Sequence, residues 1–258
     1  MRDIIVIKNL CKDYGDFKNS FRALENINLT ISKGEFLAIM GPSGSGKSTL
    51  LNLIGTIDII TKGEIYINNV RLKTMPNGEL SKFRRENIGF VFQDCNLLDT
   101  LTLRDNILAP LALANMELGK SNEIIERTAK LIEINNILDK YPSECSGGEK
   151  QRAAICRALV SNPQIIVADE PTASLDTKNS AELLEVLEKL NKNSKITIIM
   201  VTHNPVIASY CNRVVMIRDG KLDKEISRNN KEQIGFYKDI LLETAKETEI
   251  IFNKRKGK

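Results

Sequence analysis

The stretch GPSGSGKST at positions 41–49 decides the fold, since it has the form of a phosphate-binding loop. The spacing G-x-x-x-x-G-K-[ST] is met by Gly41, Gly44, Gly46, Lys47 and Ser48. Glycines let the backbone curl so that its N–H groups face phosphate oxygens, the lysine adds a charge near the β- and γ-phosphates, and the serine hydroxyl is a ligand for Mg²⁺. We expect the whole loop to bind a nucleotide, which adds Pro42, Ser43, Ser45 and Thr49 to the set.

The segment QIIVADE at 164–170 has the form of the second half of a nucleotide-hydrolysing site. Asp169 ends an apolar strand, where a carboxylate can hold magnesium through water. Glu170 follows, where it can orient or deprotonate a water molecule. The alternative is a capping pair before Pro171. Beside a phosphate-binding loop we favour the catalytic interpretation.

Two further polar residues end predicted strands. His203, the single histidine of the chain, ends TIIMVTH at 197–203 and is expected beside Glu170, where its imidazole can donate to the γ-phosphate. Gln93 ends IGFVFQ at 88–93, where its amide can reach Mg²⁺ or the attacking water. The alternatives are a structural histidine and a polar residue that closes a strand.

The turn CSGGE at 145–149 is a candidate for a second phosphate cradle. It offers a serine hydroxyl, glycine N–H groups and the positive end of a helix, through Ser146, Gly147, Gly148 and Glu149. In isolation such a string is equally typical of a flexible turn, but its place between Gln93 and Asp169 favours the cradle. This turn and the loop at 41–49 belong to one chemical site but cannot easily meet inside one molecule.

Two other segments keep two interpretations. Tyr14 lies upstream of Gly41, where its ring can stack on adenine, or it is an ordinary surface tyrosine. The triplet SLD at 174–176 is a helix N-cap and also lies where a contact across a dimer is expected, and these two roles are compatible.

Apolar runs alternate with helical patterns along the chain. EFLAIM, IIVA and TIIMV do not alternate and predict a parallel sheet buried on both faces, whereas INLTI and EIYIN alternate like half-exposed antiparallel strands. Strands are expected over 4–10, 23–31, 35–41, 63–68, 88–93, 164–170, 197–203 and 213–220. Helices are expected from Lys47 and over 121–134, 149–161, 177–193 and 230–250. In the last helix Ile234, Tyr237, Leu241 and Ala245 are expected to pack on the core, and its outer face to be free for a second subunit.

These patterns predict an α/β fold: a P-loop NTPase (RecA-like) core, an antiparallel β subdomain and a helical subdomain over about 95–160. We expect one nucleotide-binding domain over 1–225, followed by a helical extension and basic tail over 226–258.

Composition narrows the function classes. With 42% hydrophobic and 27% charged residues the chain of 258 residues is typical of a globular protein. The net charge of +4 equals the four positive charges of the tail NKRKGK at 253–258, so no nucleic-acid face is expected. That tail is either frayed or in contact with a membrane surface. Five scattered cysteines without a CxxC, and no secretion signal, indicate reduced intracellular thiols. No run reaches the roughly 18 apolar residues of a membrane span, so any membrane role is expected through a partner.

Taken together, Tyr14, GPSGSGKST, Gln93, CSGGE, VADEP, SLD and His203 resemble the nucleotide-binding subunit of ATP-binding cassette (ABC) transporters over about residues 3–225. IGFVFQDCNLLDTLTLRDNI and VTHNPVIASYCNRV look like the branch for macrolide export, lipoprotein release and peptide-antibiotic resistance. DKYPSE, ASYCNRV and FYKDIL at 236–241 look most like the bacitracin-type peptide-antibiotic resistance subunits.

The resemblance implies ATP and Mg²⁺ as cofactors, with hydrolysis coupled to transport. It implies catalytic roles for Lys47, Gln93, Glu170 and His203, and metal contacts from Ser48, Gln93 and Asp169. It also implies a homodimer at the cytoplasmic side of the cell membrane, peripheral to an integral membrane permease. In the bacitracin-type group that permease also communicates with a sensor histidine kinase. No nucleic-acid partner is expected.

The chain departs from the family pattern at two positions of the signature turn. Cys145 replaces the usual leucine and Glu149 the frequent glutamine. Cys145 is either a small apolar substitute for leucine or a thiol whose alkylation keeps the two halves apart and slows hydrolysis.

Alternative functions remain within and outside this branch. Within the branch, the alternatives are lipoprotein release and macrolide-type export. Outside the branch, they are a soluble ABC-type ATPase of DNA repair or translation, and a regulatory module that binds ATP and scarcely hydrolyses it. The single cassette and the lack of a CxxC argue against the first of these two, and the intact Glu170 and His203 against the second.

Overall fold

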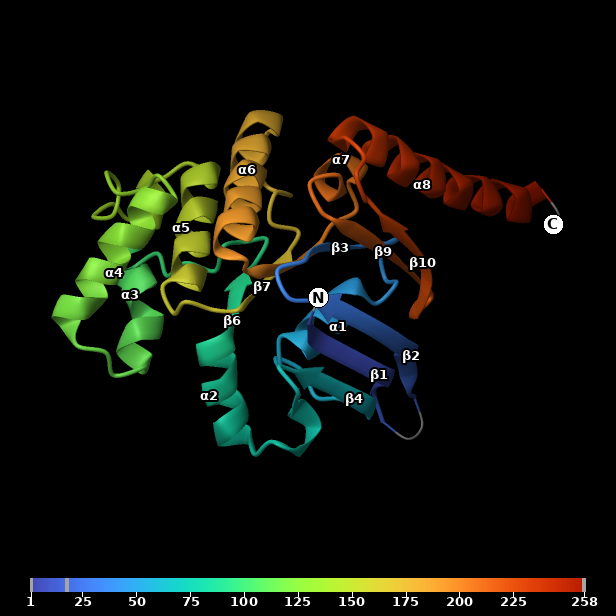
Figure 1. Cartoon of the computed structure of the whole chain (residues 1–258), viewed down its shortest axis with the longest axis horizontal. Helices are drawn as coiled ribbons and strands as arrows, with labels where there is room; N and C mark the ends of the chain where they lie inside the picture. Colours follow the sequence, from blue (N-terminus) through green and yellow to red (C-terminus); the bar gives the residue numbers. More distant parts are fainter. Residues whose placement is uncertain (1, 17–18, 257–258) are drawn as a thin grey trace.

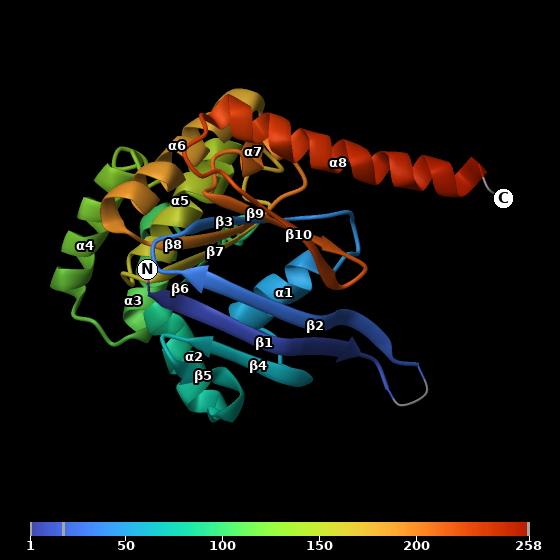
Figure 2. The same cartoon turned by 45° about the vertical axis from the view of Figure 1, so that its right-hand side comes forward.

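A computed structural model describes residues 2–16 and 19–256 of the chain, and for residues 247–256 it describes the backbone alone. The side chains of the basic tail at 253–258 therefore lie outside the described residues. Two sheets form the centre of the molecule, with one group of helices beside the larger sheet and a long final helix that projects from the body (Figures 1 and 2).

The larger sheet has six strands in the order β10-β9-β3-β8-β7-β6. Its neighbours pair in parallel from β9 to β6, and only β10 runs antiparallel to β9. The strands are β3 (Phe36–Met40), β6 (Ile88–Val91), β7 (Ile165–Asp169), β8 (Thr197–Val201), β9 (Arg213–Arg218) and β10 (Lys221–Ser227). Every residue of β3 and β8 is buried, which confirms the parallel sheet expected from the unalternating apolar runs.

The smaller sheet is antiparallel, as its alternating sequences predict. Its order is β2-β1-β4-β5, with β1 (Asp3–Tyr14), β2 (Phe21–Ser32), β4 (Lys62–Ile67) and β5 (Val70–Arg71). Helix α1 (Lys47–Ile54) lies between the two sheets (Figure 2). One continuous core joins the sheets, in which Ile5 and Leu24 of the small sheet and Leu50 of α1 lie with Leu37 and Ile199 of the large one. The phosphate-binding loop is therefore held between two rigid layers.

Six helices complete a second core on the other side of the large sheet. They are α3 (Leu103–Leu113), α4 (Leu118–Leu131), α5 (Gly147–Leu159), α6 (Thr177–Ser194), α7 (Pro205–Ala208) and α8 (Gln233–Lys256). Helix α2 (Asn77–Asn87) instead packs on the first core through Leu80 and Phe83, and short 3₁₀ turns lie at Leu72–Thr74 and Pro142–Glu144. Helices α3, α4 and α5 pack on one another, close to the expected helical subdomain over 95–160. In α6 the predicted stripe is buried through Leu183, Leu184, Leu187 and Leu190. No helix in the described ranges has the length and apolar composition needed to cross a bilayer.

The elements of the described residues that were not expected from the sequence are α2, α3, α7, β5 and β10. Helix α2 has no buried residue, and the edge strand β10 has no fully buried residue either, so neither shows the apolar period that reveals most elements. Helix α3 contains Pro110, which interrupts the helical pattern.

The buried face of α8 is the one wrong assignment among the helices. Ile234 and Leu241 of the expected stripe are 58% and 44% exposed, whereas Phe236 and Ile240 are fully buried. Helix α8 packs on α7 and β10, and this docking buries Phe236 and Ile240, each one residue before the expected Tyr237 and Leu241. Short apolar stripes that overlap on one helix cannot be separated by periodicity alone.

Phe236→Ala is expected to lower the free energy of unfolding by about 3 kcal/mol, because it removes a fully buried ring from the core. Ile234→Ala, two residues away and exposed, is the matched control and is expected to change it by less than about 0.5 kcal/mol. Urea unfolding monitored by circular dichroism measures both. Equal losses from the two variants contradict the assignment of the buried face.

Candidate nucleotide site

The candidate site lies along one edge of the large sheet. Strands β3, β8, β7 and β6 are neighbours and run in parallel, so their carboxyl ends meet at the same edge. The loop at 41–49 follows β3, His203 follows β8, and Gln93 follows β6. Asp169 ends β7, and Glu170 comes next. The topology thus brings together the residues that the sequence placed at strand ends.

The phosphate-binding loop requires glycine at two positions. Gly46 is the N-cap of α1 with φ 101°, and a Cβ there would lie 2.7 Å from the Ala23 carbonyl oxygen. Gly41 has φ 151°, and a Cβ there would lie 2.1 Å from the Ile217 carbonyl oxygen. Neither conformation nor space admits a side chain. The loop therefore passes close to both sheets before α1 begins at Lys47.

The outer part of the loop is open. Pro42, Ser43 and Gly44 are exposed, and nothing lies within 4 Å of a Cβ added to Gly44. The Ser45 hydroxyl is buried and has no hydrogen-bond partner among the described residues. Ser48 is exposed and Thr49 is half-buried, both in the first turn of α1. An open curl ahead of a helix N-terminus fits the triphosphate of a nucleotide.

Lys47 is held by its own loop. Its Nζ donates to the carbonyl oxygens of Gly41 and Pro42, each at 2.9 Å. Burial lowers the pKa of this ammonium, while the charges of Glu170 and Asp169 act in the opposite direction. These two carboxylates are therefore near enough to the lysine to belong to the same site.

Ser48 and Asp169 form the candidate metal-binding pair. The Ser48 hydroxyl donates to Asp169 Oδ1 at 3.3 Å, and burial raises the pKa of this carboxyl group. Within the part of the chain that the structure describes, no three His, Cys, Asp or Glu side chains are grouped as a metal site. A hydroxyl, a carboxylate and the amide oxygen of the exposed Gln93 are all hard oxygen donors, which fit Mg²⁺ completed by phosphate oxygens and water.

Glu170 and His203 contact each other directly. His203 Nδ1 lies 2.8 Å from Glu170 Oε1, so an ionised carboxylate accepts from an Nδ1–H tautomer and leaves Nε2 available for a ligand. Glu170 has a φ of 46°, in the left-handed region that non-glycine residues seldom adopt, and its N–H donates to the Val201 carbonyl oxygen at 3.0 Å. Such strain concentrates at functional positions.

The loop that contains Gln93 is tied to α5. Gln151 donates to the Phe92 carbonyl oxygen at 3.0 Å and accepts from the Cys95 thiol at 2.7 Å. Arg157 donates to the carbonyl oxygens of Cys95 and Asn96 at 2.6 and 2.5 Å. Sequence reasoning did not identify Gln151 or Arg157. Their spacing of six residues on α5 shows no motif by itself.

The signature turn begins α5. The Ser146 hydroxyl accepts from the Glu149 N–H at 3.3 Å, and the Glu149 carboxylate accepts from the Ser146 N–H at 2.7 Å, which is a capping box. These bonds to Ser146 lower the pKa of Glu149. The helix starts at Gly147, two residues earlier than expected, because this box fixes its first turn.

The surroundings of the turn differ from those of the phosphate-binding loop. A Cβ on Gly147 would lie 3.3 Å from Leu175, and one on Gly148 would lie 2.7 Å from Asn179 Oδ1. Asp176 of the SLD triplet is the N-cap of α6 and accepts from the Asn179 N–H at 2.8 Å, as expected. The turn therefore packs against the start of α6, whereas the phosphate-binding loop packs against β2 and β9.

Cys145 lies half-buried at the start of this turn. Its side chain packs against the second core, and its thiol donates to the Tyr141 carbonyl oxygen at 3.4 Å. This environment fits a small apolar substitute for leucine, and the partly exposed thiol remains open to alkylation. The other four cysteines are buried.

Tyr14 lies at the end of β1 and is 40% exposed. Its hydroxyl donates to Asp58 Oδ2 at 2.6 Å, and the Lys12 ammonium lies 4.6 Å from its ring centroid. Neither Lys12 nor Asp58 was identified from the sequence. One feature of the sequence could have pointed to Asp58: it is an acidic residue between Ile57 and Ile59 in the segment after α1. The structure shows both isoleucines to be exposed.

Comparison with known proteins agrees with this geometry. The family profile for the ABC transporter matches residues 24–173. The chain is 48% identical over 241 residues to the uncharacterized ABC transporter ATP-binding protein YvcR of Bacillus subtilis (strain 168), with 93% of each chain covered. It is 44% identical over 238 residues to the bacitracin export ATP-binding protein BceA of Halalkalibacterium halodurans, which covers 92% of this chain and 94% of the relative.

A solved structure is also similar. The dimeric, post-hydrolysis state of the ATP-binding cassette MJ0796 bound to ADP and Pi, from Methanocaldococcus jannaschii, superposes with a TM-score of 0.80 at 40% identity. The match covers 86% of this chain and 98% of that chain. The fold is thus the P-loop NTPase fold expected from the sequence, and the chain belongs to the ABC transporter family as an ATP-binding subunit.

Proposed function

We propose that this subunit hydrolyses ATP as one half of a homodimer at the cytoplasmic side of a membrane and drives a separate permease. The observation that supports this most is the division of the site. Lys47, Glu170 and His203 lie at the sheet edge, while the turn from Ser146 to Glu149 packs at the start of α6. A second copy that faces the first supplies the missing turn, and the solved cassette MJ0796 is dimeric.

Nucleotide binding in this scheme uses the loop and both copies. The backbone N–H groups of 41–49 hold the β- and γ-phosphates, and Lys47 exchanges the Gly41 and Pro42 carbonyl oxygens for phosphate oxygens. Ser146 and the N–H groups at the start of α5 of the other copy close over the γ-phosphate. Ser48, Asp169 and Gln93 are the residues that would hold Mg²⁺, which when bound neutralises phosphate charge.

Hydrolysis in this scheme depends on Glu170. Its carboxylate orients the attacking water and accepts its proton, while the bond to His203 Nδ1 fixes the carboxylate and leaves Nε2 for the γ-phosphate. ATP favours the closed dimer only through contacts that the open form lacks, so loss of the γ-phosphate releases the two copies.

Glu170→Gln is expected to keep ATP binding and to lower turnover by about 10²–10⁴-fold, because an amide still accepts from His203 but cannot take a proton. With ATP and Mg²⁺ this variant is expected to run as a dimer in size-exclusion chromatography with light scattering, and with ADP as a monomer. Glu185→Gln, at an exposed position on α6, is the control and keeps full turnover. Turnover near wild type removes Glu170 from the catalytic role, and a monomer at every ATP concentration, alone and with the permease, contradicts the shared site.

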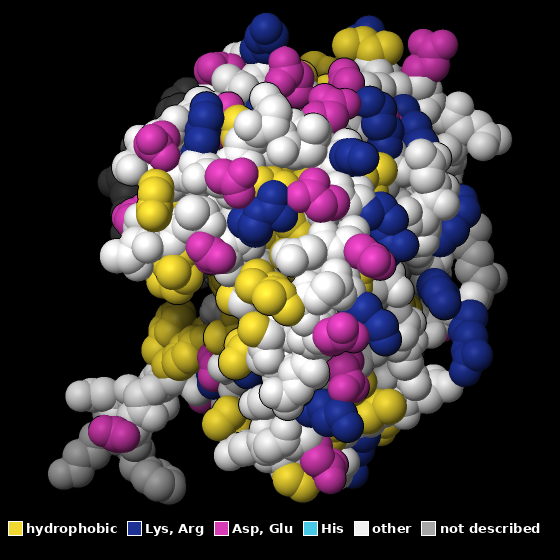
Figure 3. Space-filling view, turned by 90° about the vertical axis from the view of Figure 1, so that its left-hand side faces the viewer, with side chains coloured by type: hydrophobic (Ala, Val, Ile, Leu, Met, Phe, Trp, Pro, Cys, Tyr) yellow, Lys and Arg dark blue, Asp and Glu magenta, His cyan; other side chains and the backbone are white. Residues whose placement is uncertain are grey.

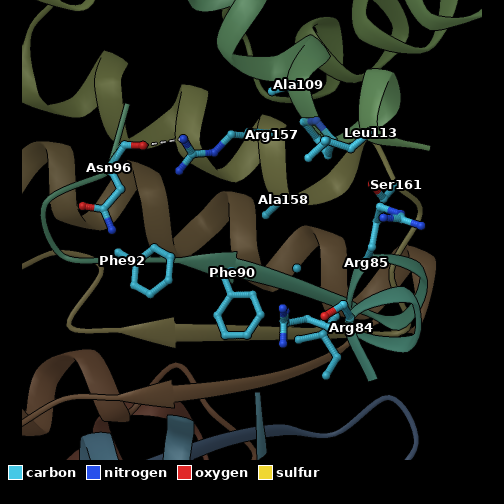
Figure 4. A pocket seen from close by; sticks show the side chains of 14 residues that line it. Arg84, Arg85, Phe90, Phe92, Asn96, Ala109, Leu113, Arg157, Ala158 and Ser161 are labelled. Atoms are coloured by element: carbon cyan, nitrogen blue, oxygen red, sulfur yellow. Dashed lines mark hydrogen bonds between the residues drawn. The ribbon is translucent and has the colours of Figure 1, made fainter. Parts of the chain in front are cut away.

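A groove beside the Gln93 loop suits a helix of the permease. It has a volume of about 520 Å³ and lies between α2, β6, α3 and α5. Figure 4 shows Phe90 and Phe92 along its floor, with ring centroids 5.6 Å apart, Leu113 above them and Arg84 at one end. The face of the molecule in Figure 3, on the side of α3 and α4, has hydrophobic side chains scattered among charged ones.

The position of this groove links a partner to the site. Arg157 lines it and also donates to Asn96 and Cys95 of the loop that follows Gln93. A permease helix seated on Phe90 and Phe92 would therefore lie next to the loop whose Gln93 would help to hold Mg²⁺. The named relatives give no support for the sensor histidine kinase that the bacitracin-type resemblance implies.

The transported class that we propose is a peptide antibiotic. The relative named as a bacitracin export subunit is similar over 92% of this chain, which supports this class. Macrolide-type export and lipoprotein release stay as alternatives within the same branch. A soluble ATPase of DNA repair or translation is the alternative from another class.

Cells that lack this subunit are expected to become more sensitive to bacitracin, because the permease then lacks the ATPase dimer whose closure on ATP drives transport. Wild type restores growth in broth dilution with bacitracin, and Glu170→Gln does not. A change in macrolide sensitivity alone supports the alternative, and unchanged sensitivity to both contradicts a role in antibiotic export.

Alkylation with N-ethylmaleimide is expected to modify Cys145 before the buried cysteines. Burial raises the pKa of this thiol, so the thiolate is scarce at neutral pH and the reaction accelerates as pH rises toward 9. The added bulk is expected to slow hydrolysis by separating the two copies, and Cys145→Ala is expected to be resistant. Full activity after labelling confirmed by mass spectrometry leaves Cys145 as a packing residue only.

A further inference from the structure

Tyr14 is fixed by two residues from different parts of the chain. Its hydroxyl donates to Asp58 Oδ2 at 2.6 Å, and the Lys12 Nζ lies 4.6 Å from the centroid of its ring. Lys12 is on the same strand, whereas Asp58 follows the phosphate-binding helix α1. The two residues therefore connect the tyrosine to the segment that leaves the nucleotide-binding core.

The ammonium group of Lys12 is buried, and an ion pair and a hydrogen bond offset the cost of burying its charge. It is 6% exposed, and its Nζ donates to Asp58 Oδ1 at 2.6 Å and to the Ile59 carbonyl oxygen at 2.9 Å. A buried ammonium is costly unless it is paired and hydrogen-bonded, so the geometry of the pair is strongly fixed. The cation beneath the Tyr14 ring is attracted to the ring face and favours one ring orientation.

The segment that presents Asp58 is anchored at its start. Thr56 is buried with a φ of 58°, and its carbonyl oxygen accepts from Arg84 of α2 at 2.8 Å. Asp58 Oδ1 also accepts from the Ile59 N–H at 2.6 Å. The Asp58 carboxylate is thus held by the Lys12 ammonium and the Ile59 N–H as well as by the Tyr14 hydroxyl.

We propose that Lys12 and Asp58 are positioning residues that hold the Tyr14 ring as a preformed platform for the adenine of ATP. One ring face lies against the Lys12 ammonium, and the adenine takes the solvent side of a ring that is 40% exposed. Fixing the ring before binding removes the entropy cost of ordering it when the base arrives. This inference rests on the ATP binding proposed above and takes the interpretation in which Tyr14 stacks on adenine.

The hydroxyl of Tyr14 adds a link to the phosphate-binding helix. Burial and the bond to Asp58 raise the pKa of Tyr14, whereas the side chain of Thr49, in the first turn of α1, lowers it. The tyrosine hydroxyl is bonded to a carboxylate beyond α1 and lies near the first turn of that helix.

Asp58→Ala is expected to weaken ATP binding about tenfold, because the ring loses its preset orientation and a stacked base contributes roughly 5- to 150-fold to affinity. Binding of inorganic tripolyphosphate, which has no base, is expected to be unchanged. Titration calorimetry without magnesium measures both ligands without turnover. Lys12→Met, which removes only the cation, and Tyr14→Phe, which keeps the ring but not the hydroxyl, are each expected to weaken ATP alone, about threefold, by losing part of the same effect.

Asp13→Ala is the matched control, since Asp13 lies next to Tyr14 on β1 and pairs with Arg22 of β2, and its loss is expected to leave both affinities unchanged. In a Tyr14→Ala background, Asp58→Ala is expected to have no further effect on ATP binding. Equal weakening of ATP and tripolyphosphate assigns Asp58 a structural role for the loop and overturns the inference. If Asp58→Ala unfolds, Tyr14→Phe and Lys12→Met decide, and wild-type affinity in both overturns it.

Tyr14→Ala separates this inference from the proposed function. If it binds ATP as wild type does, the adenine platform and the positioning roles both fail, while ATP hydrolysis by the dimer is still judged by Glu170→Gln. If it weakens ATP but neither Asp58→Ala nor Tyr14→Phe does, the stacking role stands and the positioning roles are overturned.

Discussion

The structure depends on four parallel strands, β3, β8, β7 and β6, that pair side by side and are buried on both faces. Backbone hydrogen bonds between neighbours force their carboxyl ends to one edge, so each strand delivers its next residue to the same place. The phosphate-binding loop, Asp169, Glu170, His203 and Gln93 come together for that reason, although they span most of the chain. No local preference of these residues would bring them within reach of one another.

The same sheet separates the signature turn from the site it serves in the proposed cycle. The turn is the N-terminus of α5, which packs with α3 and α4, while helix α1, which follows the phosphate-binding loop, packs in the core that joins the two sheets. A rigid, well-packed core does not allow these two parts to approach each other. A shared site between two copies satisfies both motifs without distorting either, and it makes the closed state depend on the nucleotide.

Loops that contain site residues are anchored by side chains from outside the site. Arg157 and Gln151 of α5 hold the loop after Gln93, and Arg84 of α2 holds Thr56 ahead of Asp58. Arg84 and Arg157 also line the groove beside α2. A partner bound in that groove therefore contacts two residues, Arg157 and Arg84, that support the loop after Gln93 and the segment ahead of Asp58.

The sequence by itself determined the P-loop, the residues at the strand ends, the parallel and antiparallel sheets and the family, because these follow from short motifs and from the period of apolar residues. Only the tertiary structure decided which face of α8 is buried, since Phe236 and Ile240 are chosen by the docking on α7 and not by a unique stripe. It also decided the partners of Tyr14 and of the Gln93 loop. Lys12 meets Asp58, and Cys95 meets Gln151, across long separations in sequence, and such polar pairs leave no periodic trace because the fold alone brings the two partners together.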